Sequence, residues 1–242
     1  MCAYTSTALS QLLILRYRVP DKPRFNYIEW IPLLTAFAAG SVDVISFATL
    51  GGVFASAMTG NFALLAYYVA QSESRAAMGS VVALAGFVIG CAIGILQRRG
   101  RVQSPAINLM LASETALLLC FALYAILTPH VTHASSDHLQ ILLLAVAMGL
   151  QAVSSQTISV TTIVFTTTLT KLVGSVADSL ANGDALALKE VRIRGSVVVS
   201  YLFGALLSGA LIVHKSDGVV VLPFMAVALA FALHWKLQRQ IH

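Results

Sequence analysis

The sequence predicts an all-α integral membrane protein, built as a polytopic bundle of helices. Of its 242 residues, 58% are hydrophobic and only 10% are charged. Soluble domains carry about 25% charged residues, so this composition does not suit a water-exposed surface. The apolar residues also fall into runs of about 20, which is the length that a helix needs to cross a bilayer. Such runs are helical because a backbone exposed to lipid must satisfy its own hydrogen bonds.

Eight apolar segments follow an N-terminal tail. We expect residues 1–27 to form a cytoplasmic tail, because the run LLIL at 12–15 is too short for a signal peptide and is followed by basic residues. Tyr27 and Trp30 at the start of the first segment, and Trp235 at the end of the last, are typical interface anchors. The predicted segments cover approximately residues 29–50, 51–70, 76–97, 105–128, 138–159, 160–181, 195–214 and 218–236.

The second and sixth segments have polar centres and follow their predecessors with almost no loop. The second contains MTGN at 58–61, and the sixth contains FTTTLTK at 165–171. Glycine permits a break in a helix, and Thr and Asn side chains can satisfy freed backbone groups. We therefore expect each to be broken or re-entrant, near Gly60 and between Thr168 and Lys171, giving six to eight membrane segments. A straight helix with a Thr-Gly-Asn packing face is the alternative.

The basic residues favour the re-entrant arrangement. The formal net charge is +5, and Lys and Arg lie mainly at segment ends, which is typical of a membrane protein and not of a nucleic-acid-binding one. If all eight segments cross, ten Lys and Arg face the cytoplasm and four face outside. If the second and sixth return to the face they left, the block QRRGR at 97–101 moves inside, and the distribution becomes twelve to two. Both termini are then cytoplasmic.

The two halves of the chain resemble each other. We predict a first membrane repeat at 28–128, a loop at 129–137 and a second repeat at 138–242. Four segments with one re-entrant make three crossings, so the halves would have opposite orientations, a plan that recurs in transporters. If all segments cross, the halves are parallel. Glycines four residues apart also predict close helix contacts. An alignment of the two halves without gaps matches Gly40 with Gly149, Ser46 with Ser155 and Thr59 with Thr168. The glycines four residues apart are Gly86, Gly90 and Gly94.

The stretch GSVDVISFATLGGVFASAMTGN, from Gly40 to Asn61, resembles the hallmark of the YoaK-like family of microbial integral membrane proteins of unknown function. The shared pattern includes Asp43, Leu-Gly-Gly-Val-Phe and Met-Thr-Gly-Asn. The resemblance implies a plasma or inner membrane location and no established substrate. The second half departs from the family pattern, with Ala152 in place of an expected Asn and Thr167 in place of an expected Gly.

Two acidic residues lie inside predicted spans. A lone carboxylate at membrane depth costs at least a few kcal/mol, so it should face protein, water or a partner. Asp43 is either a proton or cation site, or a structural group that caps the following segment or pairs with a buried base. Glu114, in the fourth segment, is a candidate coupling residue.

Polar residues near the predicted breaks are candidates for binding a solute or an ion. Those at the second segment either face a substrate or form a tight turn that satisfies its own backbone. Lys171 pairs with Asp43, attracts an anion or extends to an interface. We expect the two interruptions to lie close together, beside Asp43. The candidates besides Asp43 are Ser46, Thr59, Gly60, Asn61, Gln151, Ser155, Thr168 and Lys171.

These features predict a secondary transporter or permease for a small solute, coupled to protons or cations. The sequence has no phosphate-binding loop, dinucleotide fingerprint or His-Glu-x-x-His helix, so we expect no cofactor, no metal and no enzyme activity. His130, His133 and His138 are read as solvated loop residues. The alternative is a membrane scaffold or lipid-interacting protein, which should bury Asp43 in a closed pair. The expected partners are the lipid bilayer, a small solute and other copies of the chain.

Overall fold

The computed structural model describes residues 30–128, 134–157, 165–182 and 185–241. Within these ranges the chain is helical, with no strand. Six of the described helices, α2, α4, α5, α6, α8 and α9, are long and apolar enough to cross a membrane. The elements are α2 (Trp30–Thr49), α3 (Met58–Ala70), α4 (Ser74–Arg98), α5 (Gln103–Leu127), α6 (Ala134–Thr157), α7 (Phe165–Asn182), α8 (Ala185–Val213), the 3₁₀ helix η2 (Asp217–Val221) and α9 (Leu222–Ile241).

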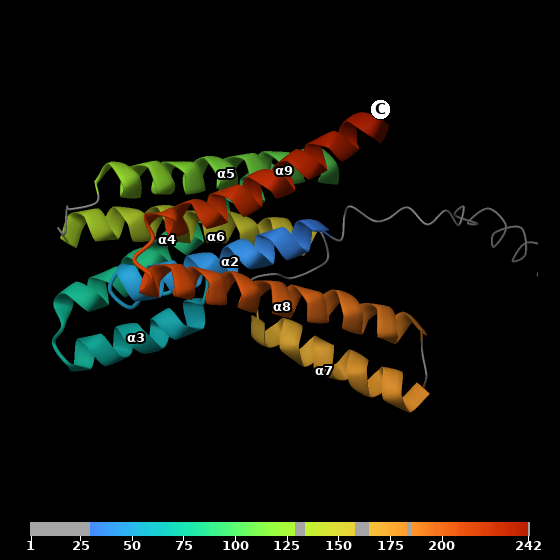
Figure 1. Ribbon diagram of the computed structural model, residues 1–242, viewed down its shortest axis with the longest axis horizontal. Helices are drawn as coiled ribbons and strands as arrows, with labels where there is room; N and C mark the ends of the chain where they lie inside the picture. Colours follow the sequence, from blue (N-terminus) through green and yellow to red (C-terminus); the bar gives the residue numbers. More distant parts are fainter. Residues whose placement is uncertain (1–29, 129–133, 158–164, 183–184, 242) are drawn as a thin grey trace, which may run out of the picture.

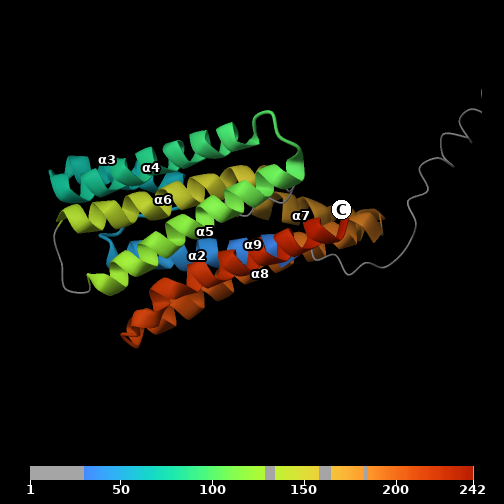
Figure 2. The same ribbon diagram turned by 90° about the horizontal axis from the view of Figure 1, so that it is seen from above.

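The long helices run side by side along the longest axis of the molecule, and the two shorter helices lie at opposite ends (Figure 1). Figure 2 shows the same bundle from above, with α4, α6, α5 and α9 successively across it. Prolines support these boundaries: Pro32, Pro105 and Pro223 each lie in the first turn of a helix, where their lack of an N–H breaks no bond. Helix α6 begins at Ala134, inside the predicted loop 129–137.

The second predicted segment does not cross the bundle. Helix α2 ends at Thr49, residues 50–57 are irregular, and α3 has only 13 residues, about 20 Å of helix. Gly51 and Gly52 turn the chain with φ of 85° and 77°, a region open to glycine. Leu50 then lines the same cavity as Ser74, so the chain leaves α2 and begins α4 at one end of the bundle.

The second segment is therefore a re-entrant hairpin, but the predicted position of its break is wrong. The irregular stretch precedes Met58, and Gly60 lies in the first turn of α3. The predicted break in the sixth segment is also wrong in position. Helix α7 runs continuously from Phe165 to Asn182, through Thr168 and Lys171. The residues between α6 and α7, 158–164, lie outside the described residues, and so does the predicted meeting of the two interruptions.

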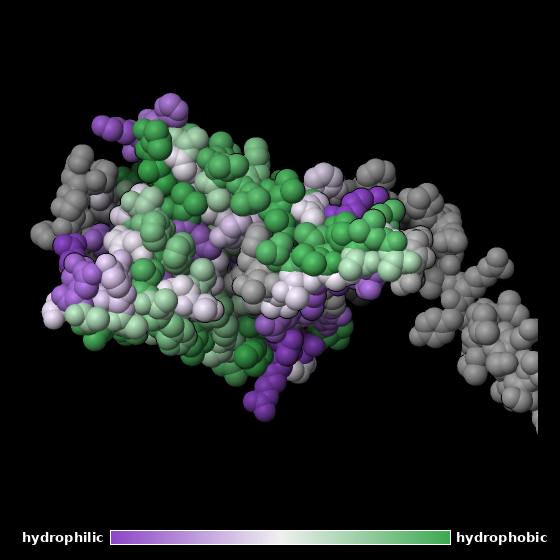
Figure 3. Space-filling model, turned by 90° about the horizontal axis from the view of Figure 1, so that it is seen from below, coloured by the Kyte–Doolittle hydropathy of each residue, from purple (hydrophilic) through white to green (hydrophobic). Residues whose placement is uncertain are grey.

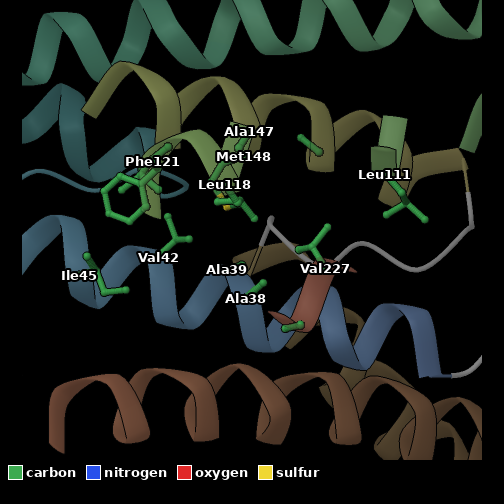
Figure 4. Packing of buried hydrophobic residues seen from close by; sticks show 14 of the residues in the cluster. Ala38, Ala39, Val42, Ile45, Leu111, Leu118, Phe121, Ala147, Met148 and Val227 are labelled. Carbon is green, nitrogen blue, oxygen red and sulfur yellow. The ribbon is translucent and has the colours of Figure 1, made fainter. Parts of the chain in front are cut away.

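The helices pack in a regular set of pairs. Helix α2 packs against α8 and α9, whereas α6 packs against α4 and α5. The hairpin helix α3 packs on α4, and α7 packs on α8. Core side chains from α2, α5, α6 and α9 converge between these pairs (Figure 4), where small residues such as Ala38 and Ala39 lie opposite Met148 and Val227. Burial of this apolar surface, at about 25 cal/mol per Å², stabilises the fold.

Glycines set the closest helix crossings. A Cβ atom at Gly40 would lie closer than 3.0 Å to the Tyr201 carbonyl on α8, and one at Gly204 would meet the Phe37 carbonyl on α2 in the same way. The α4–α6 crossing has the same geometry. There Gly90 faces the Val146 carbonyl and Gly149 faces the Phe87 carbonyl. The predicted close contact along the Gly86, Gly90 and Gly94 face of α4 is confirmed, because all three lie against α6.

The surface of the long helices is largely apolar. Exposed side chains such as Val88, Ile95, Phe203 and Leu206 face outward. Figure 3 shows a face where hydrophobic side chains cover most of the surface and strongly hydrophilic ones form separate groups. This distribution suits contact with lipid, because in a bilayer the apolar side chains are not driven into the protein interior by surrounding water. The all-α polytopic membrane fold predicted from composition is therefore confirmed.

Candidate functional site

Asp43 is buried at the meeting point of three parts of the chain. Only 3% of the residue is exposed on α2. Its Oδ1 accepts the backbone N–H of Ser56 at 2.8 Å, and its Oδ2 lies 2.5 Å from the Ser56 hydroxyl. The Tyr201 hydroxyl on α8 donates to Oδ2 at 2.8 Å. We call Asp43, Ser56 and Tyr201 the carboxyl cluster. It joins α2, the re-entrant segment and α8.

The glycine crossing of α2 and α8 positions the carboxyl cluster. Asp43 lies three residues after Gly40, and Tyr201 lies three residues before Gly204, so the close backbones bring the two side chains together. The Ser41 hydroxyl donates to the Gly204 carbonyl at 3.2 Å across the same contact. Ser56 reaches Asp43 because the hairpin re-enters the bundle. Asp43 lies six residues before the end of α2, so the chain returns by about 9 Å.

The equivalent crossing of α4 and α6 lacks these polar groups. Ala152 lies three residues after Gly149, and Phe87 lies three residues before Gly90. These positions correspond to Asp43 and Tyr201, and neither side chain can ionise. The polar cluster therefore belongs to one of the two crossings.

Gly60 and Asn61 hold the re-entrant segment in place. Asn61 is fully buried, its Oδ1 accepts the Phe54 N–H at 2.9 Å, and its Nδ2 donates to the Phe54 carbonyl at 2.5 Å. A Cβ atom at Gly60 would lie 3.2 Å from the Phe54 ring, so glycine leaves room for that ring. The ring itself stacks on Phe47 of α2 with centroids 4.9 Å apart. These contacts agree with the alternative prediction of a turn that satisfies its own backbone.

A protein family matches most of this architecture. The family model described as "Protein of unknown function (DUF1275)" matches residues 31–233, from the start of α2 to within α9. The chain belongs to this family. It is also 29% identical over 182 residues to the UPF0700 transmembrane protein YoaK of Bacillus subtilis (strain 168), covering 72% of this chain and 79% of that protein. No solved structure matches. The resemblance predicted from the stretch around Asp43 is confirmed, and this DUF1275 protein is a multi-pass membrane protein.

The remaining candidates on α2 and α6 of this DUF1275 protein are buried, and each donates a hydrogen bond to a backbone carbonyl. The Ser46 hydroxyl donates to the Asp43 carbonyl at 3.2 Å, one turn back on α2. Gln151 on α6 donates to the Thr35 carbonyl at 2.8 Å and so links α6 to α2. The Ser155 hydroxyl donates within its own helix, to the Ala152 carbonyl at 3.0 Å.

The candidates near the helix starts are divided between the surface and the interior. Thr59 is exposed on α3, and Thr168 is buried on α7. Lys171 is exposed on α7, and its backbone carbonyl accepts a bond from Arg194 at 3.1 Å. The predicted pairing of Lys171 with Asp43 is wrong, because no ion pair joins these two described residues: Lys171 is exposed, and the Asp43 carboxyl is buried against Ser56 and Tyr201.

Glu114 is the second buried acid. It is fully buried on α5, and neither carboxylate oxygen has a hydrogen-bond partner within the described residues. The two ion pairs found in those residues, Arg75–Asp137 and Arg194–Glu190, involve neither Glu114 nor Asp43. Both intramembrane acids are therefore without a basic partner in the part of the chain that is described.

Sequence reasoning missed Ser56 and Tyr201, the two partners of Asp43. Ser56 falls in a segment that pattern alone makes helical, and Tyr201 is separated from Asp43 by 158 residues. The one available signal for Tyr201 was its place three residues before a glycine on a small-residue face, which a single sequence does not connect to Gly40. Hydroxyl groups donate and accept hydrogen bonds, so both partners can bond either a carboxylate or a protonated acid.

Two cavities open near the end of the bundle where α2 terminates. One, of about 430 Å³, is lined by Leu50, Gly51, Glu73, Arg75, Asp137 and His138, among others. The other, of about 440 Å³, includes Thr49, Ile126, Lys215 and Asp217. Asp43 lines neither of them. Among the predicted loop histidines, His138 lines the first cavity, whereas 130 and 133 lie outside the described residues.

Proposed function

We propose that this protein is a secondary transporter for a small solute, coupled to protons or cations, with Asp43 as the carboxyl that binds the coupling ion or the solute. The observation that carries the proposal is the carboxyl cluster. Asp43 is buried at membrane depth, and its partners within the described residues are hydroxyls and a backbone N–H, with no base among them. A carboxyl with neutral partners can gain or lose a proton while its neighbours rotate their hydroxyl hydrogens. Intramembrane acids commonly mark ion pathways.

The pairing of the helices supports an inverted repeat of two four-helix units, α2–α5 and α6–α9. The first helix of each unit packs on the third helix of the other, as in α2–α8 and α6–α4. The second helix of each packs on its own third helix, as in α3–α4 and α7–α8. Helices α3 and α7 lie at opposite ends of the bundle (Figure 1), as opposite orientations require. Transporters use such repeats to open a central site to each side in turn.

The difference between the α2–α8 and α4–α6 crossings supports a single binding site within the inverted repeat. The crossing of α2 and α8 carries Asp43 and Tyr201, whereas the crossing of α4 and α6 carries Ala152 and Phe87. In this proposal the first crossing holds the site and the second supplies only packing. The solute leaves the protein chemically unchanged, so no enzyme step is involved.

Asp43 is closed off from both cavities, which fits an occluded state in the transport proposal. The same closure favours the runner-up, a membrane scaffold or lipid-interacting protein in which Asp43 only fastens the hairpin to α8. The two functions differ in what Asp43→Asn should do. A transporter loses ion coupling and stays folded, whereas a scaffold loses stability because a buried hydrogen-bonded group has been altered.

The charge distribution supports a plasma membrane protein with both termini in the cytoplasm. Six spans place the start of α2 and the end of α9 at one end of the bundle (Figure 1). That end carries basic residues on α4, α8, α9 and the loop between α4 and α5, whereas Arg75 and Lys215 lie at the other end. Basic loops remain in the cytoplasm. The basic end includes Arg98, Arg99, Arg101, Lys189, Arg192, Lys236 and Arg239.

The test is solute-driven ion movement in proteoliposomes. The purified full chain is reconstituted with a pH-sensitive dye inside and mixed with amino acids, carboxylates, organic cations or sugars. We expect one class to change the internal pH, and Asp43→Asn to abolish the change while its elution and thermal unfolding stay as in the wild type. Asp178→Asn, at an exposed acid on α7, is the matched control and should behave as the wild type. Unchanged coupling in Asp43→Asn, or no response to any class from folded protein, would contradict the proposal.

A further inference from the structure

Helix α5 carries a buried acid that the carboxyl cluster does not use. Glu114 is fully buried, and both of its carboxylate oxygens lack hydrogen-bond partners within the described residues. A buried polar group without a partner costs about 1–3 kcal/mol, and more when it is charged. Buried groups of this kind are rare in native proteins, so Glu114 requires a reason beyond packing.

A ladder of polar side chains leads into the seam between α5 and α9 from the basic end of the bundle. Gln238 on α9 donates to Ser104 and accepts from Asn108, both on α5. The Asn108 Oδ1 lies 2.5 Å from Nδ1 of His234 on α9. We call Ser104, Gln238, Asn108 and His234 the α5–α9 ladder. Its deepest members, Asn108 and His234, are buried.

The ladder fixes the tautomer of His234. Because the Asn108 amide nitrogen donates to Gln238, its oxygen must accept from the imidazole, so Nδ1 carries the hydrogen. The other ring nitrogen, Nε2, then holds the lone pair and can take up a proton. In proteins, the hydrogen bond that one ring nitrogen of a histidine makes determines whether the other nitrogen carries a hydrogen.

Glu114 lies farther along α5 than the ladder, and about 120° round the helix from Asn108. It is six residues beyond Asn108 on α5, which is about 9 Å along the helix axis. Leu111 lies between them in the sequence and belongs to the core shown in Figure 4. The ladder therefore reaches from the basic end to within two helical turns of the acid.

Apart from the Cys91 thiol of α4, which donates to the Gly149 carbonyl on α6, the other ionisable groups on the packed elements lie toward the ends of the bundle. Helix α6 carries Asp137 and His138 at its start, and η2 begins at Asp217, both at the cavity end. Helix α4 carries Arg98 at its basic end, and α9 carries Lys236 and Arg239 beyond His234. Among the described residues of α4, α6, η2 and α9, His234 is thus the ionisable group that bonds to a buried side chain of α5.

We propose that Glu114 is a second proton-binding site, which exchanges protons with the cytoplasm through His234. Nε2 of His234 takes a proton from water at the basic end, while Nδ1–H stays bonded to Asn108. The imidazolium then releases that proton, through water admitted to the seam, to the Glu114 carboxylate. A neutral imidazole and a neutral acid remain, which removes a charge that the membrane interior disfavours. The inference rests on the proton coupling proposed above.

Infrared difference spectroscopy of the full chain in liposomes, without any solute, tests the proposal. Acidification should produce a carboxylic acid band that Glu114→Gln abolishes and Glu114→Asp shifts. Thr115→Val, which removes a neighbouring hydroxyl bonded only to its own helix, is the control and should keep the band. His234→Gln keeps a donor for Asn108 and should slow deuterium exchange of the band by about 10-fold or more.

Each outcome decides the proposal. A band that persists in Glu114→Gln, or the absence of any acid-dependent band in folded wild type, would overturn the proton site. Unchanged exchange in His234→Gln would overturn the route through His234. Glu114→Met should raise the thermal midpoint, since it removes unsatisfied oxygens, whereas a lowered midpoint would indicate a structural role. The Glu114 band should survive in Asp43→Asn, so this proposal and the transport proposal can fail separately.

Discussion

The Asn61 side chain bonds both backbone groups of Phe54, accepting its N–H at 2.9 Å and donating to its carbonyl at 2.5 Å. Phe54 lies in the irregular stretch between α2 and α3, where no helical bond is available to it. Backbone groups at membrane depth must find partners inside the protein. The amide of Asn61 thus replaces the two bonds that a continuous helix would supply.

We predict that Asn61→Leu destabilises the hairpin. Leucine has the same number of side-chain heavy atoms and the same branching but leaves the Phe54 N–H and carbonyl unpaired, at about 1–3 kcal/mol for each group. Thermal unfolding in detergent, followed by the fraction that survives size-exclusion chromatography, should show a lower midpoint. Asn61→Asp keeps the acceptor and loses the donor, so its thermal midpoint should lie between those of Asn61→Leu and the wild type. Thr59→Ala, at the exposed face of α3, should stay within about 0.5 kcal/mol of the wild type. A wild-type midpoint for Asn61→Leu would contradict this account.

The sequence was enough to predict the re-entrant hairpin but not the position of its break. The length of an apolar run depends on the thickness of the membrane, and the placement of Lys and Arg depends on the side of the membrane that a loop faces. Both constraints act on each segment separately. The role of Asn61 depends on Phe54, and a polar side chain at a turn looks the same whether it bonds its neighbours or a ligand. The pairing of Asp43 depends on Tyr201, on a different helix. Lys171 does not pair with Asp43 because its side chain lies on the exposed face of α7, which a single sequence does not reveal.

We predict that Gly40→Ala separates α2 from α8. The added Cβ would lie closer than 3.0 Å to the Tyr201 carbonyl, and a backbone atom cannot move aside cheaply. Overpacking of this kind costs about 1–3 kcal/mol. Gly149→Ala should have a similar cost at the α4–α6 crossing, since its Cβ would meet the Phe87 carbonyl. Thermal midpoints measure both effects.

Gly174→Ala on α7 is the matched control for these glycine variants. A Cβ atom there would meet nothing within 4 Å, so helix propensity should raise stability by up to about 1 kcal/mol. If Gly40→Ala and Gly174→Ala unfold at the same temperature, the crossing at Gly40 does not limit the packing of α2 on α8.

We predict that Tyr201→Phe weakens coupling and leaves the fold in place. The ring remains, while Asp43 loses a hydroxyl donor at 2.8 Å. A hydrogen bond to a charged group contributes about 1.5–3 kcal/mol, so solute-driven pH change should slow by about 10-fold or more. Tyr67→Phe removes a hydroxyl from an exposed tyrosine on α3 and should be neutral. Full coupling in Tyr201→Phe would show that the carboxyl cluster does not need its α8 partner.

The last prediction concerns the side of the membrane that each end of the bundle faces. Single cysteines are introduced at Arg99, Ser72, Lys215 and Arg239 after Cys2, Cys91 and Cys120 have been replaced by serine. An impermeant thiol reagent is then added to intact cells. With six spans and a re-entrant hairpin, Ser72→Cys is labelled from outside and Arg99→Cys is not, because Arg99 shares the basic end with the start of α2. If the second and sixth segments crossed fully, both results would reverse. Lys215→Cys should be labelled and Arg239→Cys protected in either arrangement, so these two positions calibrate the assay, and labelling of Arg99→Cys from outside would exclude the topology proposed here.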